Sequence, residues 1–229
     1  IVNLSLGNMD YYIKQLKHAR PYGAKPVPIS IPDDQIEGIP PMVYQAQMIR
    51  IPIPKFAAEG RTSPRVTVEG GATAAVDQGE RAIVDTMRFV MPATLHYGNT
   101  SALRVQDILV FDIVRSTQWE RPLYFAITAG GDDSKIGLRD YLELEGLAYK
   151  LVPRKKQAYW AAVNEERTRA HLFSDVNQPS KEQAYGCLWR GLQDSTIKFD
   201  ENQRRMISSY RQPFYTLAMY LSNVKNKPE

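Results

Sequence analysis

The sequence predicts an α/β fold, with a mostly parallel sheet flanked by helices in a Rossmann-like three-layer arrangement. The run Leu123–Ile127 carries no charge and is rich in aromatic and aliphatic residues, which is typical of a strand buried on both faces. The apolar run Ile1–Leu6 is followed by a turn and a helical pattern, which is half of a βαβ unit. A second helical pattern, from Ser101 to about Thr117, leads into the Leu123 strand.

The first unit of this fold is predicted at the start of the chain. Ile1–Leu6 is expected to be a strand, and Asp10 is placed to cap a helix over Tyr11–His18. Helix-then-strand order recurs at Leu123–Ile127, so we expect these two strands to be buried, parallel neighbours.

Prolines dominate the next part of the chain, where nine of them fall between Pro21 and Pro64. This density excludes long helices and central strands. The alternating run Met48–Ile53 predicts a short edge strand, and Arg65–Val76 predicts a hairpin. We therefore expect a Pro-rich β and loop insertion at about 21–100, within an α/β domain covering residues 1–199.

A short helix and a strand are predicted after the Leu123 strand. Leu147–Val152 is apolar and is followed by Pro153, which predicts a strand that stops there. The apolar positions just before Gly146 favour a short helix stopped by this glycine. On a helix, Glu143 and Glu145 point in different directions and form no carboxylate pair for acid-base chemistry; on a strand they would share a face.

The last segment, residues 200–229, predicts an amphipathic helical unit. Asp200 is a cap candidate, and apolar residues recur at spacings of three and four from Met206 to Leu221. Pro213 predicts a break or kink near Arg211.

Composition indicates a globular chain of ordinary core size. It has 229 residues, 43% of them hydrophobic and 24% charged, and a net charge of +4. No apolar run is long enough to cross a membrane. The dispersed basic residues and the absence of a recognisable nucleic-acid module argue against nucleic acid as a partner. Cys187 is the one cysteine, and it is interpreted as a small packed side chain.

Several runs resemble a bacterial family of multi-spanning membrane proteins. They are Trp119–Thr128, Gly137–Pro153, the opening Val2–Leu6 with Asp10–Ile13, and Asp200–Met206. The chain resembles the soluble C-terminal, extracytoplasmic region of these protein O-mannosyltransferase-like proteins, a region labelled as a domain of unknown function.

The resemblance implies a GT-C type glycosyltransferase with a lipid-linked sugar donor. It also implies that the membrane-spanning part lies upstream and is a partner of this region, which would sit in the periplasm or otherwise outside the cytoplasm. The abrupt start at Ile1 fits an excised piece. No residue matches a catalytic motif of such enzymes, so we expect no catalytic residue and no cofactor in this piece.

One crevice is predicted as a ligand site. If strands end at Leu6 and Ile127, polar groups of Asn8, Asp10, Thr128, Asp132 and Asp133 would gather outside the strand ends, where they suit sugar hydroxyls or a cation. The alternative is that these residues only cap helices and form turns, since Asp, Asn and Thr commonly do so.

The remaining candidate groups are assigned structural roles. His18, His96 and His171 are far apart in sequence and show no metal-ligand spacing, so no metal site is predicted. Arg121 is expected to pair with a carboxylate or stack on a ring. Trp160 and Trp189 are the candidates for an exposed aromatic platform.

Three functions follow from these observations. The first is a non-catalytic extracytoplasmic accessory domain of a membrane glycosyltransferase, which binds an acceptor or glycan. The second is a protein-interaction scaffold whose terminal helices lead into helical repeats. The third, a stand-alone carbohydrate-active enzyme, is weakest because no nucleophile-base or paired-carboxylate signature is present.

Overall fold

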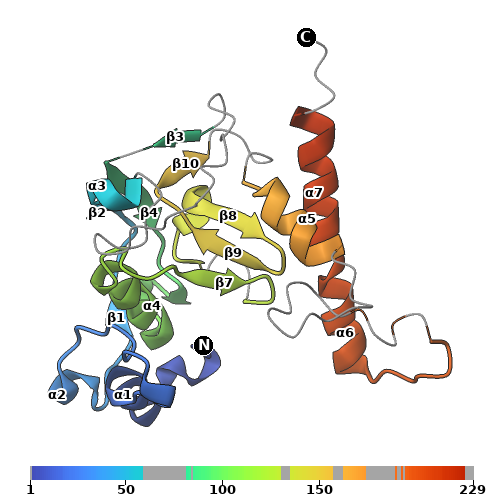
Figure 1. Cartoon of the computed structure of the whole chain (residues 1–229). Coiled ribbons are helices and arrows are strands. Elements are labelled where there is room, and N and C mark those ends of the chain that lie inside the picture. The colour runs from blue at the N-terminus through green and yellow to red at the C-terminus, as the bar shows by residue number, and fades with distance from the viewer. Residues whose placement is uncertain are drawn as a thin grey trace. The chain divides into compact units, whose positions relative to one another are not determined.

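The structure is a computed structural model, and it describes residues 2–58, 81–83, 85–129, 135–156, 162–173, 189, 192 and 194–224. The chain divides into two compact units. The first comprises residues 1–74, 83–123 and 129–139, and the second comprises 75–82, 124–128 and 140–229. Figure 1 shows the elements that the following paragraphs describe, unit by unit.

The prediction of a mostly parallel sheet is wrong. The described strands form small sheets with the orders β1-β6-β5, β2-β4, β10-β3 and β7-β9-β8. The pairs β1–β6, β5–β6, β2–β4, β7–β9 and β8–β9 are all antiparallel. A parallel contact does occur between Leu144 and Val163, as an isolated bridge. The fold is therefore a mixture of helices and short antiparallel sheets, not a Rossmann-like arrangement.

The start of the chain is helical, which corrects the strand predicted at Ile1–Leu6. Ile1 itself lies outside the described residues. Ser5–Asn8 forms a 3-10 helix (η1), and α1 follows at Asp10–His18. Gly7 allows this turn to approach α4, because a Cβ atom on Gly7 would lie 3.3 Å from the Gln106 and Leu109 side chains. The apolar run at the start packs as a turn of helix instead of pairing as a strand.

The first unit has its hydrophobic core between α1, α2 and α4. The helix α4 spans Val105–Ser116 with Thr117 as its C-cap, which agrees with the predicted end near Thr117. Ser101 lies in β6 and does not cap this helix. The short helix α2 covers Asp33–Ile36. The buried members of the core are Ile13, Ile29, Ile36, Val105, Leu109 and Ile113.

The Pro-rich part of the first unit contains only short elements among its described residues. These are η2 (Pro21–Gly23), β1 (Met42–Val43), β2 (Gln47–Pro52) and α3 (Lys55–Ala58). The strand predicted at Met48–Ile53 is confirmed by β2, whereas the hairpin predicted at Arg65–Val76 lies outside the described residues.

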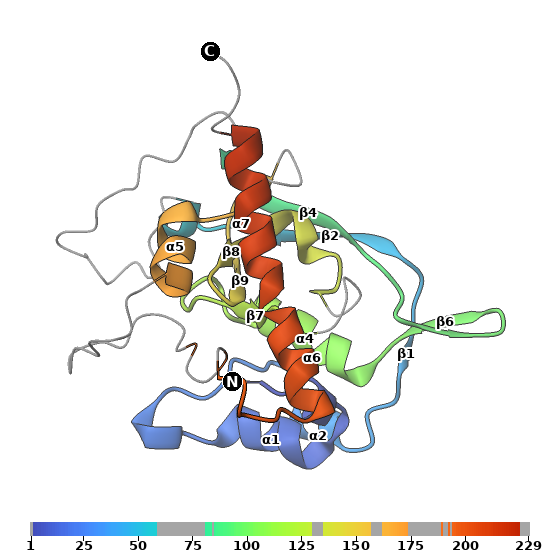
Figure 2. The same cartoon turned by 90° about the vertical axis from the view of Figure 1, so that its right-hand side faces the viewer.

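Strands supply the rest of the first unit. β2 pairs with β4 (Thr86–Met91), and the two strands run side by side in Figures 1 and 2. A tight hairpin at Gly98 joins β5 (Leu95–Tyr97) to β6 (Thr100–Leu103). Gly98 has a φ of +56°, which glycine adopts with little strain.

The second unit is built on the sheet β7-β9-β8. β7 spans Tyr124–Ala126, β8 spans Leu142–Glu145 and β9 spans Ala148–Leu151. The predicted strands at Leu123–Ile127 and Leu147–Val152 therefore exist. However, β7 is an edge strand in which Phe125 is buried while Tyr124 and Ala126 are exposed, so the prediction of burial on both faces is wrong.

Further elements of the chain lie around residues 81–83, 138–141 and 154–173. The 3-10 helix η4 (Leu138–Tyr141) precedes β8, and β10 (Arg154–Lys156) pairs with β3 (Arg81–Ile83). The helix α5 spans Glu165–Phe173.

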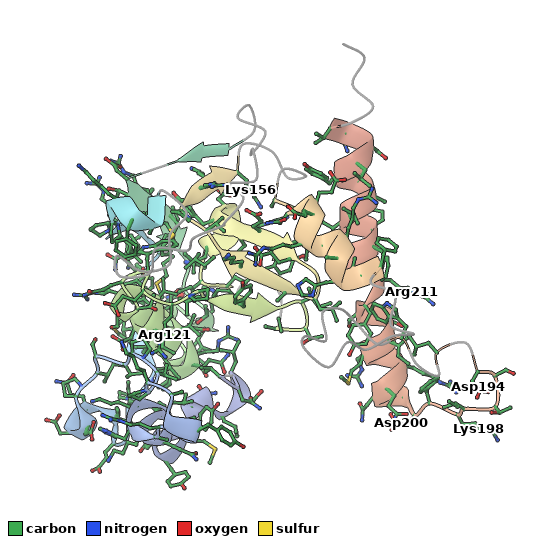
Figure 3. The ribbon with its side chains drawn as sticks, in the orientation of Figure 1. Arg121, Lys156, Asp194, Lys198, Asp200 and Arg211 are labelled. Carbon is green, nitrogen blue, oxygen red and sulfur yellow. The ribbon has the colours of Figure 1, made fainter. Side chains whose placement is uncertain are left out.

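Two helices close the second unit, as predicted. α6 spans Glu201–Ser209, and Asp200 caps it in a capping box with Gln203. α7 spans Arg211–Val224, with Pro213 in its first turn, where a proline removes no helical hydrogen bond. Figure 3 shows Asp200 at the start of α6 and Arg211 at the junction of the two helices.

One face of the β7-β9-β8 sheet faces an apolar core with α5 and α7. Leu144, Val163, Leu172 and Leu217 are its buried members. Trp189 packs against the rings of Tyr210 and Phe214, with centroid separations of 5.8 and 5.7 Å. No helix within the described residues has the length and apolar character needed to span a membrane.

Candidate functional site

The structure gives Asn8 and Asp10 structural contacts at the start of the chain. The Asn8 side-chain amide donates to Gln106 Oε1 at 2.9 Å, and the Gln106 backbone N–H donates to Asn8 Oδ1 at 3.2 Å. The Asp10 carboxylate accepts from the Gly38 backbone N–H at 2.8 Å, and Asp10 is the first residue of α1, not its cap. Both residues connect neighbouring segments of the first unit.

The other members of the predicted crevice belong elsewhere. Thr128 lies in the second unit, just after β7, whereas Asp132 and Asp133 lie outside the described residues. Because residues 5–8 are helical, the argument that strand ends converge at Asn8 fails. Ligand binding by these residues stays a prediction.

A different polar surface stands out in the second unit, on the face of the β7-β9-β8 sheet opposite its apolar core. The register places Glu143, Lys150 and Tyr124 in one row across the three strands. Glu145, Ala148 and Ala126 form the next row. Since side chains directly opposite each other share a face, these six residues form one surface, which we call the carboxylate face.

The two carboxylates share this face because residues 142–145 form a strand, not the predicted helix. The turn after β8 uses Gly146 at a φ of +66°, which links β8 to β9 as a hairpin instead of ending a helix. Glu143 and Glu145 are only 6% and 7% exposed, which is rare for acidic residues. The helix prediction therefore missed a buried carboxylate pair.

Glu145 is surrounded by polar and cationic groups. The Tyr124 hydroxyl donates to Glu145 Oε2 at 3.1 Å. Lys150 Nζ lies 3.5 Å from Glu145 Oε1, and Arg167 Nη1 of α5 lies 3.5 Å from Oε2. Lys150 also stands 5.9 Å from the centre of the Tyr124 ring. These partners compensate the buried negative charge, which a folded chain requires.

Tyr124 acts as a proton donor in this cluster. Burial first, and the Glu145 carboxylate second, raise the pKa of Tyr124 from 10.0 to about 12. Although the residue is 46% exposed overall, its hydroxyl lies in the partly buried contact with Glu145. At neutral pH the hydroxyl stays protonated, so Tyr124 is unsuited to act as a nucleophile or a general base.

The edge of the carboxylate face is fixed by α5. The Thr168 hydroxyl is fully buried, donates to the Leu144 carbonyl at 2.9 Å, and accepts from the Gly146 backbone N–H at 3.3 Å. A Cβ atom on Gly146 would lie 2.7 Å from the His171 Cβ, so α5 approaches the turn closely. These contacts position α5, and with it Arg167, whose Nη1 lies 3.5 Å from Glu145 Oε2.

The arrangement favours recognition over bond cleavage. The Glu145 carboxylate is buried, whereas the Lys150 ammonium and the Arg167 guanidinium belong to side chains that are 23% and 58% exposed. These two cationic groups can donate hydrogen bonds to a hydroxyl-rich ligand. Ala126 and Ala148 leave the second row of the face without bulky side chains beside Glu145. Tyr124, Lys150 and Arg167 already engage both carboxylate oxygens of Glu145.

Other residues singled out from the sequence have structural roles. Arg121 donates to the backbone carbonyls of Lys25 and Pro26 at 3.1 and 2.5 Å, so its role is architectural, but its partners are not a carboxylate or a ring. The Trp189 indole donates to the Leu172 carbonyl at 3.1 Å and belongs to an aromatic cluster, so it is not a free platform. Trp160 and Cys187 lie outside the described residues.

The histidines have separate surroundings. His18 Nε2 lies 2.7 Å from Asp33 Oδ2, and His96 Nδ1 lies 3.0 Å from Ser101 Oγ. Within the part of the chain that the structure describes, no three His, Cys, Asp or Glu side chains gather in a way that could hold a metal ion.

Comparison with known proteins gives one match. A family model described as TMEM260-associated domain 2 matches residues 67–170. This range includes Tyr124, Glu143, Glu145, Lys150 and Arg167, whereas Asn8 and Asp10 lie outside it. No curated protein and no solved structure matches the chain.

Proposed function

We propose that this chain is a non-catalytic, extracytoplasmic accessory domain of a protein O-mannosyltransferase-like membrane glycosyltransferase, and that it binds an acceptor or a glycan. The observation that carries the proposal is the charge-compensated carboxylate face. Glu145 has a hydroxyl donor and two cations around it, and this composition suits hydrogen bonding to hydroxyl-rich ligands. The catalytic residues would belong to the membrane-embedded partner region.

The match supports the accessory role, because its description names a domain associated with TMEM260 and names no catalytic activity. The resemblance of Trp119–Thr128 and Gly137–Pro153 to the O-mannosyltransferase-like proteins supports the glycosyltransferase context. Both the matched range and these runs contain residues of the carboxylate face.

Titration of the purified, isotope-labelled chain tests this proposal. Mannose-containing oligosaccharides and a Ser/Thr-rich peptide are added at millimolar concentration while backbone amide shifts are recorded. We expect shifts at β7, β8 and β9 that Lys150→Met weakens. The matched control is Lys155→Met, because Lys155 is half exposed and lies 3.9 Å from Asp140. Absence of shifts with both probes would refute binding of these ligands.

Catalysis is tested separately with lipid-linked and nucleotide sugars. We expect no turnover by the purified chain. Turnover that Glu143→Gln or Glu145→Gln abolishes would show that the carboxylate face is an active site and would overturn the non-catalytic role.

One observation favours the scaffold as a second candidate. Residues 212–224 carry no charged side chain, and α7 leaves Tyr215 63% and Met219 40% exposed. Positions 215 and 219 are one turn apart and share a helix face. An uncharged, partly apolar helix face of this kind is suited to contact with further helices.

A further inference from the structure

The hairpin formed by β5 and β6 carries the sequence Asn99-Thr100-Ser101 at its turn. An asparagine followed two residues later by serine or threonine, with no proline between them, is the acceptor sequence for N-linked glycosylation. Residues 96–100 are all exposed. Figure 2 shows the hairpin extending away from α4. The acceptor sequence therefore lies where the first unit is open to solvent.

The turn itself does not require an asparagine at position 99. Asparagine is common in tight turns because it tolerates a positive φ or hydrogen-bonds to its own backbone. In this turn Gly98 has the positive φ, +56°, and Asn99 does not have one. Within the part of the chain that the structure describes, the Asn99 side chain makes no hydrogen bond. The fold alone does not explain Asn99, and its side-chain amide is available for a reaction.

The space beside this turn suits a bulky attachment. A Cβ atom on Gly98 would meet nothing within 4 Å. Tyr97 is directly opposite Thr100 and is 67% exposed. An exposed aromatic ring offers an apolar surface with a polar tip, against which a sugar ring can pack. A sugar on Asn99 would therefore have solvent on one side and an aromatic ring on the other.

The hydroxyl of the acceptor sequence comes from Ser101. This residue pairs with His96 across the hairpin, and Ser101 Oγ lies 3.0 Å from His96 Nδ1. A hydroxyl can donate one hydrogen bond and accept others, so the histidine does not use its whole capacity. Ser101 is thus able to hydrogen-bond to a transferring enzyme as well.

A second sequence of the same type, Asn3-Leu4-Ser5, lies at the start of the chain. Its asparagine takes part in the fold, because Asn3 Oδ1 accepts from the backbone N–H groups of Ser5 and Leu6 at 3.0 and 3.4 Å. Ser5 is also the first residue of η1. These contacts hold the Asn3 amide against its own backbone, whereas Asn99 has no such contact. The structure therefore favours Asn99 as the acceptor.

We propose that Asn99 is an acceptor site for N-linked glycosylation. The co-substrate is an oligosaccharide carried on a lipid diphosphate. Asn99 Nδ2 forms a bond to the anomeric carbon of the first sugar, and the bond from that carbon to the diphosphate oxygen breaks. The lipid diphosphate leaves, and a base of the transferring enzyme takes the proton that Nδ2 loses.

The inference adds a covalent site in the first unit to the accessory role proposed above. It rests on the extracytoplasmic location in that proposal, because N-linked acceptor sequences are modified in secreted parts of proteins. The site can still be tested apart from the accessory role. An experiment that sets the location independently separates the two.

Production of the chain behind a secretion signal in insect cells is this experiment. The signal brings the chain to the transferring enzyme, so a missing glycan would count against the Asn99 site and not against the accessory role. Enzymatic removal of an N-linked glycan converts the attached asparagine to aspartate. Trypsin releases residues 89–104, in which Asn99 is the one asparagine, so mass spectrometry identifies the site. We expect aspartate at position 99 after glycan removal.

Variants test both recognised groups. Asn99→Gln and Ser101→Ala should each abolish the modification, whereas Ser101→Thr retains the hydroxyl and should preserve it. The matched control is Asn202→Gln, which changes an exposed asparagine with no hydroxyl residue two positions later and should leave Asn99 modified. Asn99 is exposed and has no positive φ, so Asn99→Gln is expected to fold, and circular dichroism checks it.

Three outcomes would overturn the proposal. The first is an unmodified Asn99 in the secreted chain, whether or not Asn3 carries a glycan. The second is a modification that Ser101→Ala leaves unchanged. The third is a glycan on residues 89–104 that persists in Asn99→Gln, which would place the attachment on a hydroxyl group instead of the Asn99 amide.

Discussion

The Tyr124 hydroxyl donates a hydrogen bond to Glu145 Oε2 at 3.1 Å, across the sheet that links β7 to β8 through β9. This contact joins an edge-strand residue to a buried carboxylate 21 positions later. It also makes the ionisation of Tyr124 depend on the fold, because the unfolded chain has no such contact.

Deprotonation of Tyr124 should lower the free energy of unfolding at alkaline pH. Its folded pKa of about 12 exceeds the reference value of 10.0, so the folded state retains a proton that the unfolded state loses. The contribution is complete below pH 10 and is lost as pH rises towards 12. Because Tyr124 is 46% exposed, we expect at most about 1 kcal/mol.

Resolved titration of the tyrosine ring carbons measures this pKa directly, with Tyr124→Phe identifying the signal. The variant should also lose less stability than the wild type between pH 10 and 12. A Tyr124 signal that titrates near 10 would contradict the prediction.

Replacing Glu145 should destabilise the second unit. Glu145→Ala leaves Lys150 and Arg167 without their carboxylate and removes the acceptor of Tyr124. Lys150 and Arg167 are 23% and 58% exposed, so water partly replaces the lost contact. We expect a loss of about 1 to 3 kcal/mol.

Urea denaturation measures this loss. The control is Glu120→Ala, an exposed glutamate whose replacement should change the unfolding free energy by less than about 0.5 kcal/mol. Equal effects of the two substitutions would mean that the Glu145 contacts contribute nothing to stability.

The carboxylate face shows which features the sequence could reveal and which it could not. Asp200 and Pro213 are local signals, and they correctly predicted the start of α6 and the boundary of α7. The segment Leu142–Gly146 is short enough to fit both a helical and an alternating pattern, and the helix interpretation was wrong. On a helix Glu143 and Glu145 would point in different directions, so the helix interpretation excludes the carboxylate pair that the strand forms.

Strand pairing was the least predictable feature. The apolar run Leu123–Ile127 was expected to be buried on both faces, yet only Phe125 is buried within β7. Its partner β9 lies 24 residues later at the Phe125–Tyr149 pair, and no local pattern specifies that contact or its antiparallel direction. The crevice predicted at Asn8 required a strand that ends at Leu6. Residues 5–8 form a 3-10 helix, so this requirement is not met.

Gly146 should be less replaceable than Gly38. Both have positive φ values, +66° and +64°, so alanine is strained at either position. A Cβ atom at Gly38 meets nothing within 4 Å, whereas one at Gly146 would lie 2.7 Å from the His171 Cβ. We expect Gly38→Ala to cost about 1 kcal/mol and Gly146→Ala about 1 to 3 kcal/mol more.

Thermal unfolding of the two variants measures the difference. Adding His171→Gly to Gly146→Ala removes the obstructing side chain, so the double variant should lose less than the sum of its two single losses. Strict additivity of the two losses would show that the His171 contact does not cause the extra loss.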